Sequence, residues 1–244
     1  MLSNKVVLIT GAAHRLGATT ARMLHGEGMN ILLHYRHSRD AAEALQTELN
    51  DIRPDSIKLL QADLHDTQRL PELIAEAIEI WDRLDVLINN ASSFYATPIG
   101  SVTEAQWDDL IGSNLKAPLF LSQAAAPYLR QHQGCIVSIV DIHAERPLKE
   151  FPVYSMAKAG LVMLTKSLAC ELGPEVRVNA VAPGAILWPE NLGEAEKEKI
   201  ISRTFLKRQG APEDIARAIL YLVRDAGYVS GQVITVDGGR SLNS

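Results

Sequence analysis

The sequence is poor in cysteine and has no excess of positive charge, and both shortages exclude classes of protein. Of its 244 residues only two are cysteines, Cys135 and Cys170, each within an apolar stretch. Two cysteines cannot build the disulfide framework of a small secreted domain, so we expect both to be reduced core residues of a cytoplasmic protein. The net charge of -5 gives no electrostatic attraction for nucleic acid or an anionic membrane, and neither is expected as a partner.

Long apolar runs and metal-ligand spacings are also missing. No apolar run reaches the roughly 18 residues of a transmembrane helix, so none is expected. The N-terminal stretch MLSNKVVLITG lacks the cleavage region of a signal peptide, because its short apolar run leads into a glycine turn. Neither cysteine belongs to a CxxC motif, the seven histidines form no HExxH pattern, and no metal site is expected.

Short apolar runs alternate with longer amphipathic ones along the chain. The predicted strands carry Val, Ile and Leu at consecutive positions, as strands buried on both faces do. They are Val6–Thr10, Asn30–His34, Ile57–Gln61, Val86–Asn89, Cys135–Val140, Arg177–Val181 and Val233–Val236. The predicted helices repeat apolar residues every three or four positions. They are Leu16–Glu27, Ala41–Asp51, Leu70–Trp81, Glu104–Arg130 and Val153–Leu172.

This alternation predicts an α/β fold, a single-domain Rossmann-type doubly wound parallel sheet with helices on both faces. No Pro/Gly/Ser-rich linker divides residues 1–244, so one domain is expected. The stretch from Trp188 to Arg208 is polar, charged and only weakly periodic. It is interpreted as a mobile substrate flap near residues 186–208.

A glycine turn, in VVLITGAAHRLG, follows the first predicted strand and opens the first predicted helix. Backbone amides and a helix N-terminus can face a pyrophosphate there. Gly11 and Gly17 are spaced like the outer glycines of TGxxxGxG, with Arg15 where the middle glycine would stand. Alone the motif is weak, but its position after the first strand favours dinucleotide binding.

The end of the second predicted strand indicates which dinucleotide binds. NAD sites usually place an acid there to bind the ribose hydroxyls. Here LLHYRHS presents Arg36, His37 and Ser38 instead. Guanidinium groups bind phosphate through paired, charge-assisted hydrogen bonds, so we expect Arg36 and Arg15 to meet the 2′-phosphate of NADPH. An ordinary basic surface loop is the alternative. Asp63, after the third strand, is placed to meet the adenine edge.

Tyr154 and Lys158 are four residues apart in YSMAK, so on a helix they share one face. A nearby ammonium is expected to lower the pKa of the phenol and make it a better proton donor or acceptor near neutrality. Lys158 can also hold the nicotinamide ribose. A YxxxK pattern is common, but Asn89–Ala91 after the fourth strand and Asn114 in the next helix enlarge the constellation.

From end to end, the chain resembles the short-chain dehydrogenase/reductase family. The matching motifs, in order, are TGAAHRLG, Asp63-Leu64, NNA at Asn89–Ala91, Asn114, YSMAK, the Pro183-Gly184 turn and the terminal VDGG. The resemblance implies that Tyr154 donates a proton, that Lys158 activates it and binds the ribose, and that Asn114 anchors a water or the lysine. The family's usual serine is missing, because Asp141 stands thirteen residues before Tyr154.

Within that family the chain looks like the pteridine reductases. The features shared with them are RLG in the first turn, HYRHS after the second strand, NNASSF after the fourth, and Asp141. The resemblance implies NADPH-dependent reduction of a dihydropterin, of the dihydrobiopterin, dihydromonapterin or dihydrofolate type, by a homotetramer. In those enzymes an aromatic ring at the position of Phe94 stacks on the pterin, and Tyr154 and Asp141 would manage ring-nitrogen protons.

The resemblance also implies two sets of site residues. Those for the cofactor are Gly11, Arg15, Leu16, Gly17, Tyr35, Arg36, His37, Ser38, Asp63, Leu64, Asn90, Ala91, Ser92, Tyr154, Lys158, Pro183 and Gly184. Those for the pterin are Arg15, Ser92, Phe94, Asp141 and Tyr154. Ser92 is open to either phosphate or pterin, and loop packing is the alternative for Phe94.

Asp141 bears on the choice of substrate. A serine hydroxyl donates to the alkoxide that forms from a ketone, whereas an ionised aspartate would repel it and raise the pKa of Tyr154. A pterin offers imine and amide nitrogens, which a carboxyl group can serve. The alternative is a strand-end turn in which Asp141 caps backbone amides.

Two other functions stay open at this point. One is a carbonyl or 3-oxoacyl reductase with an unusual acid at the serine position. The other is a non-catalytic dinucleotide-binding sensor, although the complete set of Asn114, Tyr154 and Lys158 counts against it.

Overall fold

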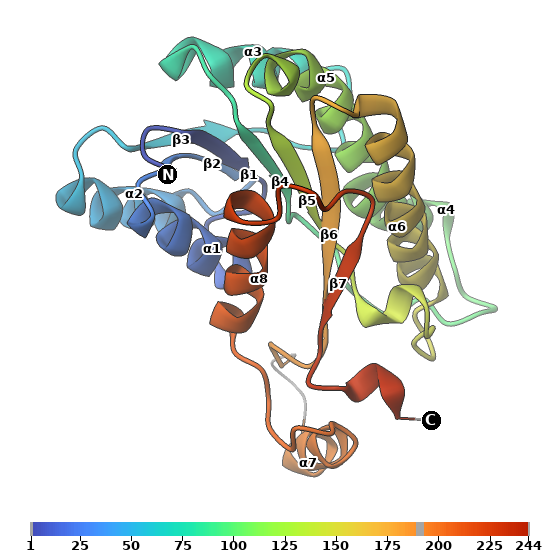
Figure 1. The fold of residues 1–244 in the computed structure, drawn as a ribbon. Helices are drawn as coiled ribbons and strands as arrows, with labels where there is room; N and C mark the ends of the chain where they lie inside the picture. Colours follow the sequence, from blue (N-terminus) through green and yellow to red (C-terminus); the bar gives the residue numbers. More distant parts are fainter. Residues whose placement is uncertain (1, 189–192, 244) are drawn as a thin grey trace.

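Seven parallel strands form one sheet at the centre of the molecule. The computed structural model describes residues 2–188 and 193–243, and Figure 1 shows the strands side by side with helices on both faces. All pairs are parallel, in the order β3-β2-β1-β4-β5-β6-β7. The strands are β1 (Val6–Ile9), β2 (Asn30–Tyr35), β3 (Ile57–Gln61), β4 (Val86–Asn89), β5 (Cys135–Ile139), β6 (Arg177–Pro183) and β7 (Val233–Val236). The predicted doubly wound α/β fold is confirmed.

The central strands are apolar because helices exclude water from both of their faces. β1 and β5 are buried along their whole length, and Leu8 and Ile136 have no exposed surface. Burying one such side chain contributes about 1.5–3 kcal/mol, which favours these strands only inside a two-sided core. The strand order reverses between β1 and β4. In open α/β sheets a crevice forms at such a reversal, beyond the carboxyl ends of the strands.

Two layers of helices cover the sheet (Figure 1). One layer consists of α1 (Arg15–Gly26), α2 (Arg39–Ile52) and α8 (Pro212–Arg224). The opposite layer contains α3 (Leu70–Trp81), α5 (Ala117–Gln131) and α6 (Pro152–Leu172). Each layer closes its own apolar core against one face of the sheet, which explains the three- and four-residue spacing of apolar side chains.

The helix predicted over Glu104–Arg130 is interrupted. The structure has α4 (Glu104–Ile111), a π-helical stretch (Gly112–Lys116) and then α5. Gly112 packs so tightly that a Cβ there would lie 2.5 Å from Nδ1 of His65. Pro118, in the first turn of α5, has no amide hydrogen with which to continue an α-helical ladder. The wider turn places Asn114 fully inside the molecule.

The segment predicted as a flap contains a helix that the sequence did not indicate. α7 (Glu194–Ser202) lies within it and stands apart from the sheet in Figure 1, while residues 189–192 lie outside the described part of the chain. None of the α7 residues is buried, and EAEKEKIIS has no apolar stripe. Glu, Lys and Ala are strong helix formers, so intrinsic propensity explains the helix where burial does not. The mobility of the segment stays a prediction.

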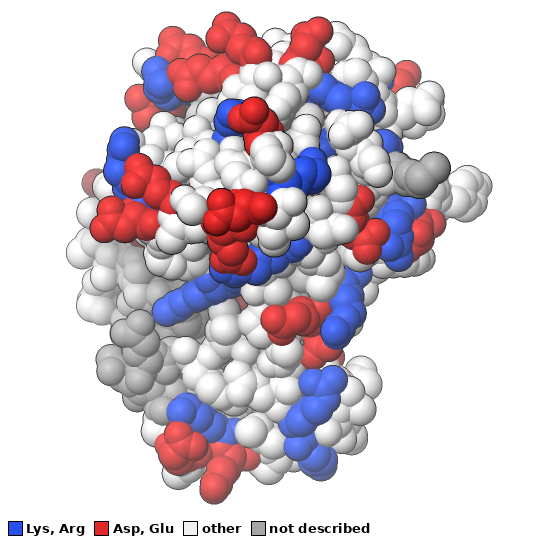
Figure 2. All heavy atoms as spheres, turned by 90° about the vertical axis from the view of Figure 1, so that its left-hand side faces the viewer, with Lys and Arg blue, Asp and Glu red and all other residues white. Residues whose placement is uncertain are grey.

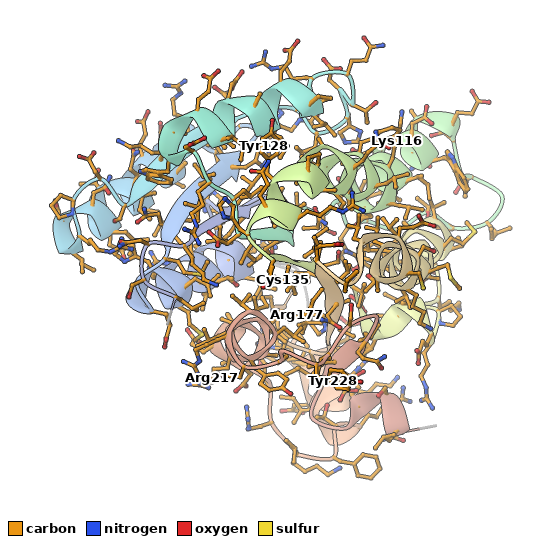
Figure 3. The ribbon with its side chains drawn as sticks, turned by 45° about the horizontal axis from the view of Figure 1, so that its top comes forward. Lys116, Tyr128, Cys135, Arg177, Arg217 and Tyr228 are labelled. Carbon is orange, nitrogen blue, oxygen red and sulfur yellow. The ribbon has the colours of Figure 1, made fainter. Side chains whose placement is uncertain are left out.

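The two cysteines differ in burial. Cys135 is buried at the start of β5, but Cys170 is exposed on α6, so the prediction of two core cysteines is wrong for Cys170. An apolar stretch on a helix also includes outward-facing positions, and Cys170 occupies one. Arg177, opposite Cys135 on β6, donates to the carbonyl oxygens of Leu222 and Ala226 in the α8 region (Figure 3). Burial raises the pKa of the Cys135 thiol to about 11, which keeps it protonated.

Charged side chains of both signs are interspersed on the surface. Figure 2 shows one face on which acidic and basic groups alternate. Arg22 of α1 pairs with Glu48 of α2 at 2.6 Å, and Arg224 of α8 pairs with Glu27 at 2.9 Å. Water and salt screen such exposed pairs, so they are a minor source of stability. Among the described helices, none is long and apolar enough to cross a membrane.

Candidate active site

A cavity of about 440 Å³ lies where the strand order reverses, and the loops after β1, β2, β3 and β4 form its walls. It brings together most of the residues predicted to bind the cofactor. These are Gly11, Arg15, Leu16, Gly17, Tyr35, Arg36, His37, Ser38, Asp63, Leu64, Asn90, Ala91 and Ser92. Pro183, Gly184, Tyr154 and Lys158 do not line it among the described residues. Gly184 packs instead on Asp237, where a Cβ would lie 2.5 Å from the aspartate Cβ.

The turn after β1 forms a narrow cradle at one end of this cavity. Gly11 has φ +61°, and a Cβ there would lie 3.0 Å from the Cα of Ala91. A Cβ on Gly17 would lie 2.5 Å from the carbonyl oxygen of Gly11, so both positions require glycine. The Asn90 amide donates to the carbonyl oxygens of Thr10, at 2.8 Å, and Gly11, at 3.1 Å. This cradle, with the N-terminus of α1 beside it, fits the pyrophosphate of a dinucleotide.

Arg36 and Asp63 form an ion pair at the opposite end of the cavity. The guanidinium Nη2 lies 2.7 Å from Oδ2 of Asp63, and both side chains are about half exposed. Burial opposes ionisation of Asp63, but the backbone amide of His65 and the charge of Arg36 outweigh it and lower the pKa of the carboxyl. Arg36, which was predicted to bind the 2′-phosphate, and Asp63, which was predicted to meet the adenine, are therefore paired with each other in this structure.

Asp141 uses its two oxygens for two different purposes. Oδ1 accepts a hydrogen bond from the backbone amide of His143 at 2.8 Å and caps a short 3₁₀ turn (Ile142–Ala144) after β5. Oδ2 accepts from the phenolic hydroxyl of Tyr154 at 2.9 Å. The strand-end cap therefore also faces the predicted proton donor, and a catalytic role for Asp141 stays a prediction.

Burial is the largest influence on the pKa values of Tyr154 and Lys158, the predicted catalytic pair. The pKa of Tyr154 is raised well above its ordinary value, first by burial and then by the charge and hydrogen bond of Asp141. The expected lowering of this pKa by Lys158 is therefore wrong for this structure. The Lys158 Nζ lies 5.6 Å from the centre of the Tyr154 ring and donates to the carbonyl oxygen of Ile139 at 2.9 Å. Burial lowers the pKa of Lys158 to about 8, although Asp141 works in the opposite direction.

The ring of Tyr154 belongs to a group of three aromatic rings, with Phe94 and Phe151. The rings of Phe94 and Phe151 are stacked, with centroids 4.7 Å apart and planes 13° apart. Phe94 also meets the ring of Tyr154 edge to face, with centroids 4.8 Å apart. Phe94 remains 47% exposed, so a face or edge of the ring is available to a flat ligand.

Asn114 and Ser92 link the cavity to the loop that carries Phe94. The Asn114 amide nitrogen donates to the carbonyl oxygens of Ser93, at 2.9 Å, and Leu110, at 3.0 Å. Its amide oxygen accepts from the hydroxyl of Ser92 at 2.6 Å. In this arrangement Asn114 fixes the position of the loop, and no hydrogen bond between its side chain and Lys158 is found among the described contacts.

Two residues of the site were not predicted from the sequence. Phe151 lies between a turn and the first residue of α6, and no periodicity marks its stacking on Phe94. His34 ends a predicted strand, and no role in the site was predicted for it. It is buried at the edge of the cofactor cavity and bonds to the glycine turn. Its position, two residues before Arg36 in LLHYRHS, was the available signal.

Comparisons with known proteins give matches over nearly the whole chain. A family model described as enoyl-(acyl carrier protein) reductase matches residues 11–241. Pteridine reductase 1 of Leishmania tarentolae is 36% identical over 278 residues, covering 97% of this chain and 96% of that protein. The 3-oxoacyl-(acyl-carrier-protein) reductase of Thermotoga maritima is 35% identical over 243 residues, covering 98% of both. The protein of the same name from Staphylococcus aureus strain Mu50 is 35% identical over 244 residues, covering 98% of this chain and 99% of that one.

Proposed function

The chain belongs to the short-chain dehydrogenase/reductase family, and from that premise we propose that it is an NADPH-dependent pteridine reductase. As a member of that family it is an oxidoreductase that uses a nicotinamide dinucleotide. The observation that carries the finer proposal is the 2.9 Å hydrogen bond from the Tyr154 hydroxyl to Asp141 Oδ2, beside the exposed ring of Phe94. The similarity to the pteridine reductase of L. tarentolae supports it.

The proposed reaction adds a hydride to carbon and a proton to nitrogen across a C=N bond of a dihydropterin. The reduced nicotinamide, when bound, supplies the hydride. The raised pKa of Tyr154 keeps its phenol protonated near neutral pH, so it holds a proton for the ring nitrogen. In this structure the hydroxyl donates to Asp141, so it must turn from the carboxylate to the ring nitrogen to deliver its proton. Lys158, in its ammonium form, stabilises the phenolate that remains.

Asp141 also explains why a pterin fits better than a ketone. Reduction of a ketone develops negative charge on the oxygen next to Tyr154, and an ionised carboxylate there would oppose it. A ring nitrogen that takes up a proton develops no such charge, and a pterin's ring N–H groups can donate to the carboxyl. The edge and face of Phe94 provide an apolar surface for the flat ring.

NADPH is proposed over NADH because Arg36 and Arg15 both line the cavity. Two guanidinium groups match a 2′-phosphate in charge and geometry. Binding requires Arg36 to turn from Asp63 toward the phosphate, and it leaves Asp63 free to meet the adenine edge. The homotetramer implied by the resemblance is also a proposal, and light scattering of the purified protein measures it directly.

A second candidate is a 3-oxoacyl-(acyl-carrier-protein) reductase. The relatives from T. maritima and S. aureus bear that name at nearly the same identity and coverage as the pteridine reductase. This substrate is a ketone, so its reduction would place an alkoxide beside Asp141.

One substrate panel separates these functions. NADPH oxidation is followed with a dihydropterin, dihydrofolate, a 3-oxoacyl thioester and a simple diketone, each over a range of concentrations. The proposal expects the highest kcat/KM with the dihydropterin. A higher value with the 3-oxoacyl thioester would replace the pteridine assignment with the second candidate. Tight NADPH binding with no oxidation by any compound would return the sensor interpretation.

A further inference from the structure

Two consecutive backbone amides of the glycine turn end on one residue, His34. The amide of Gly11 donates to Nδ1 of the His34 imidazole at 3.2 Å. The next amide, of Ala12, donates to the backbone carbonyl oxygen of His34 at 2.9 Å. A side-chain bond and a main-chain bond from the same residue therefore fix the start of the turn.

The second ring nitrogen of His34 defines the tautomer. Nε2 lies 3.1 Å from the carbonyl oxygen of Ala62, which can only accept a hydrogen bond. Nε2 must carry the hydrogen, and Nδ1 is then the acceptor that the Gly11 amide needs. The side chain is 2% exposed, so water does not compete for either bond. A neutral ring with one defined tautomer satisfies both partners.

The position of His34 in the sheet lets it bond to the glycine turn after β1 and to Ala62 after β3. It lies in β2, which pairs with β1 on one side and β3 on the other, and the turn and Ala62 follow those two strands. From the other direction, the Asn90 amide binds the carbonyl oxygens of Thr10 and Gly11. His34 therefore accepts from the backbone amides of the turn, and Asn90 donates to its carbonyl oxygens. The bonds made by His34 and Asn90 do not use the backbone amides at the start of α1, which have no acceptor within the helix.

We propose that His34 is a positioning residue for the dinucleotide. By holding Gly11 and Ala12, it sets the direction of the chain as it enters α1. The backbone amides in the first turn of α1 then keep one orientation, toward the pyrophosphate, even if the loop moves. The inference rests on the use of a dinucleotide by this family and is independent of the pteridine assignment. The described hydrogen bonds of the His34 ring go to backbone groups of Gly11 and Ala62, so we expect His34 to affect NADPH and NADH alike.

Two substitutions test the two ring nitrogens of His34 separately, because each keeps a polar atom near one nitrogen and loses the other. In His34→Asn the amide oxygen stands near the position of Nδ1 and can accept from Gly11, while the bond to Ala62 is lost. In His34→Gln the amide nitrogen reaches the position of Nε2 and can donate to Ala62, while Gly11 loses its acceptor. Both variants remove the ring and keep a polar amide, so each is the control for the other.

The measurement is the Kd of NADPH and NADH by fluorescence titration, with no pterin present. We expect His34→Gln to weaken both cofactors about tenfold, the effect of one lost buried hydrogen bond, and His34→Asn to stay within about threefold of wild type. In the cofactor-free protein, hydrogen exchange of the Gly11 amide should accelerate in His34→Gln and not in His34→Asn.

A purely structural role predicts a different pattern. It would lower the melting temperature of both variants without separating their cofactor affinities. Equal Kd values for the two variants, or unchanged Gly11 exchange in His34→Gln, would overturn the proposal. So would a ¹⁵N spectrum of the wild type in which Nδ1 of His34 carries the proton. Failure to reduce pterins would overturn only the proposed function, because none of these measurements uses a pterin.

Discussion

The guanidinium of Arg36 and the carboxylate of Asp63 are paired at 2.7 Å across the mouth of the cofactor cavity. The two residues follow neighbouring strands, β2 and β3, and the pairing of these strands brings them together. A cofactor with a 2′-phosphate must compete with Asp63 for Arg36. NADH has no such phosphate and leaves the ion pair intact.

We therefore expect Asp63→Asn to increase the preference for NADPH. An ion pair of this exposure contributes about 0.2–1 kcal/mol, so releasing Arg36 should raise the ratio of NADPH to NADH affinity by about 1.5- to 5-fold. Any lost contact with adenine affects both cofactors and cancels in the ratio. The matched variant is Arg36→Asp, which should reduce NADPH affinity far more than NADH affinity. An unchanged ratio in both variants would remove Arg36 from the choice of cofactor.

Phe94→Ala should raise the KM for a dihydropterin while changing kcat much less. Stacking of a flat ring on an aromatic side chain contributes about 1–3 kcal/mol in comparable sites, which corresponds to roughly 5- to 150-fold. The value should lie toward the low end, because Phe151 already covers part of the ring. Phe151→Ala serves as the control, since it removes the packing partner and leaves Phe94 in place. If Phe94→Ala leaves the pterin KM unchanged, the ring only packs its own loop.

Acid should destabilise the protein through His34. Burial lowers the pKa of His34 to about 4, although a hydrogen bond to Ala62 and the charge of Asp63 oppose the shift. The unfolded chain binds this proton near pH 6.5 and the folded protein only near pH 4, so stability falls as the pH drops between these values. The loss from this residue reaches up to about 3 kcal/mol. Urea unfolding at pH 7 and pH 4.5 gives the free energy of unfolding at each pH. Between these values the decrease should be smaller in His34→Asn than in wild type, and an equal decrease would mean that other groups cause it.

The fold followed from the sequence because its strands carry consecutive apolar residues, which are fully buried in the central strands β1, β4 and β5. Consecutive apolar residues marked β3, β4 and β7 with the bounds that the structure has, and erred only at ends such as β6, which runs on to Pro183. The two elements that were not predicted have different causes. The π-helical stretch requires Gly112 to pack on His65, and α7 forms without burying an apolar face.

The candidate site shows the same division. Spaced motifs were enough to place most of the residues predicted to bind the cofactor around one cavity, because loops after neighbouring parallel strands meet at one edge of the sheet. The stack of Phe151 on Phe94 and the bond from Gly11 to His34 join residues with no local pattern between them. The lowering of the Tyr154 pKa expected from Lys158 does not occur, because burial, which no local pattern indicates, raises this pKa together with Asp141.

Asp141 gives the most discriminating prediction. Asp141→Ala removes both the acceptor for Tyr154 and the cap on the amide of His143. A positioned acid–base group typically supplies about 10²–10⁴-fold, so pterin turnover should fall by that order while NADPH still binds. Loss of the cap alone costs about 1 kcal/mol of stability, which does not account for such a fall in turnover. Asp141→Asn keeps an oxygen for the His143 amide and separates the two effects.

The Asp141→Ser variant tests the choice of substrate. It restores a hydroxyl that can donate to a developing alkoxide, so dihydropterin reduction should fall while reduction of a reactive diketone holds or rises. Removing the carboxylate also removes one cause of the raised pKa of Tyr154, so tyrosinate absorbance should appear at lower pH in Asp141→Asn than in wild type. The kcat/KM for both substrates and the tyrosinate titration are measured on all three variants. If Asp141→Ala reduces a dihydropterin as fast as the wild type, Asp141 is only the cap of its turn. The pteridine assignment then loses the interaction on which it depends.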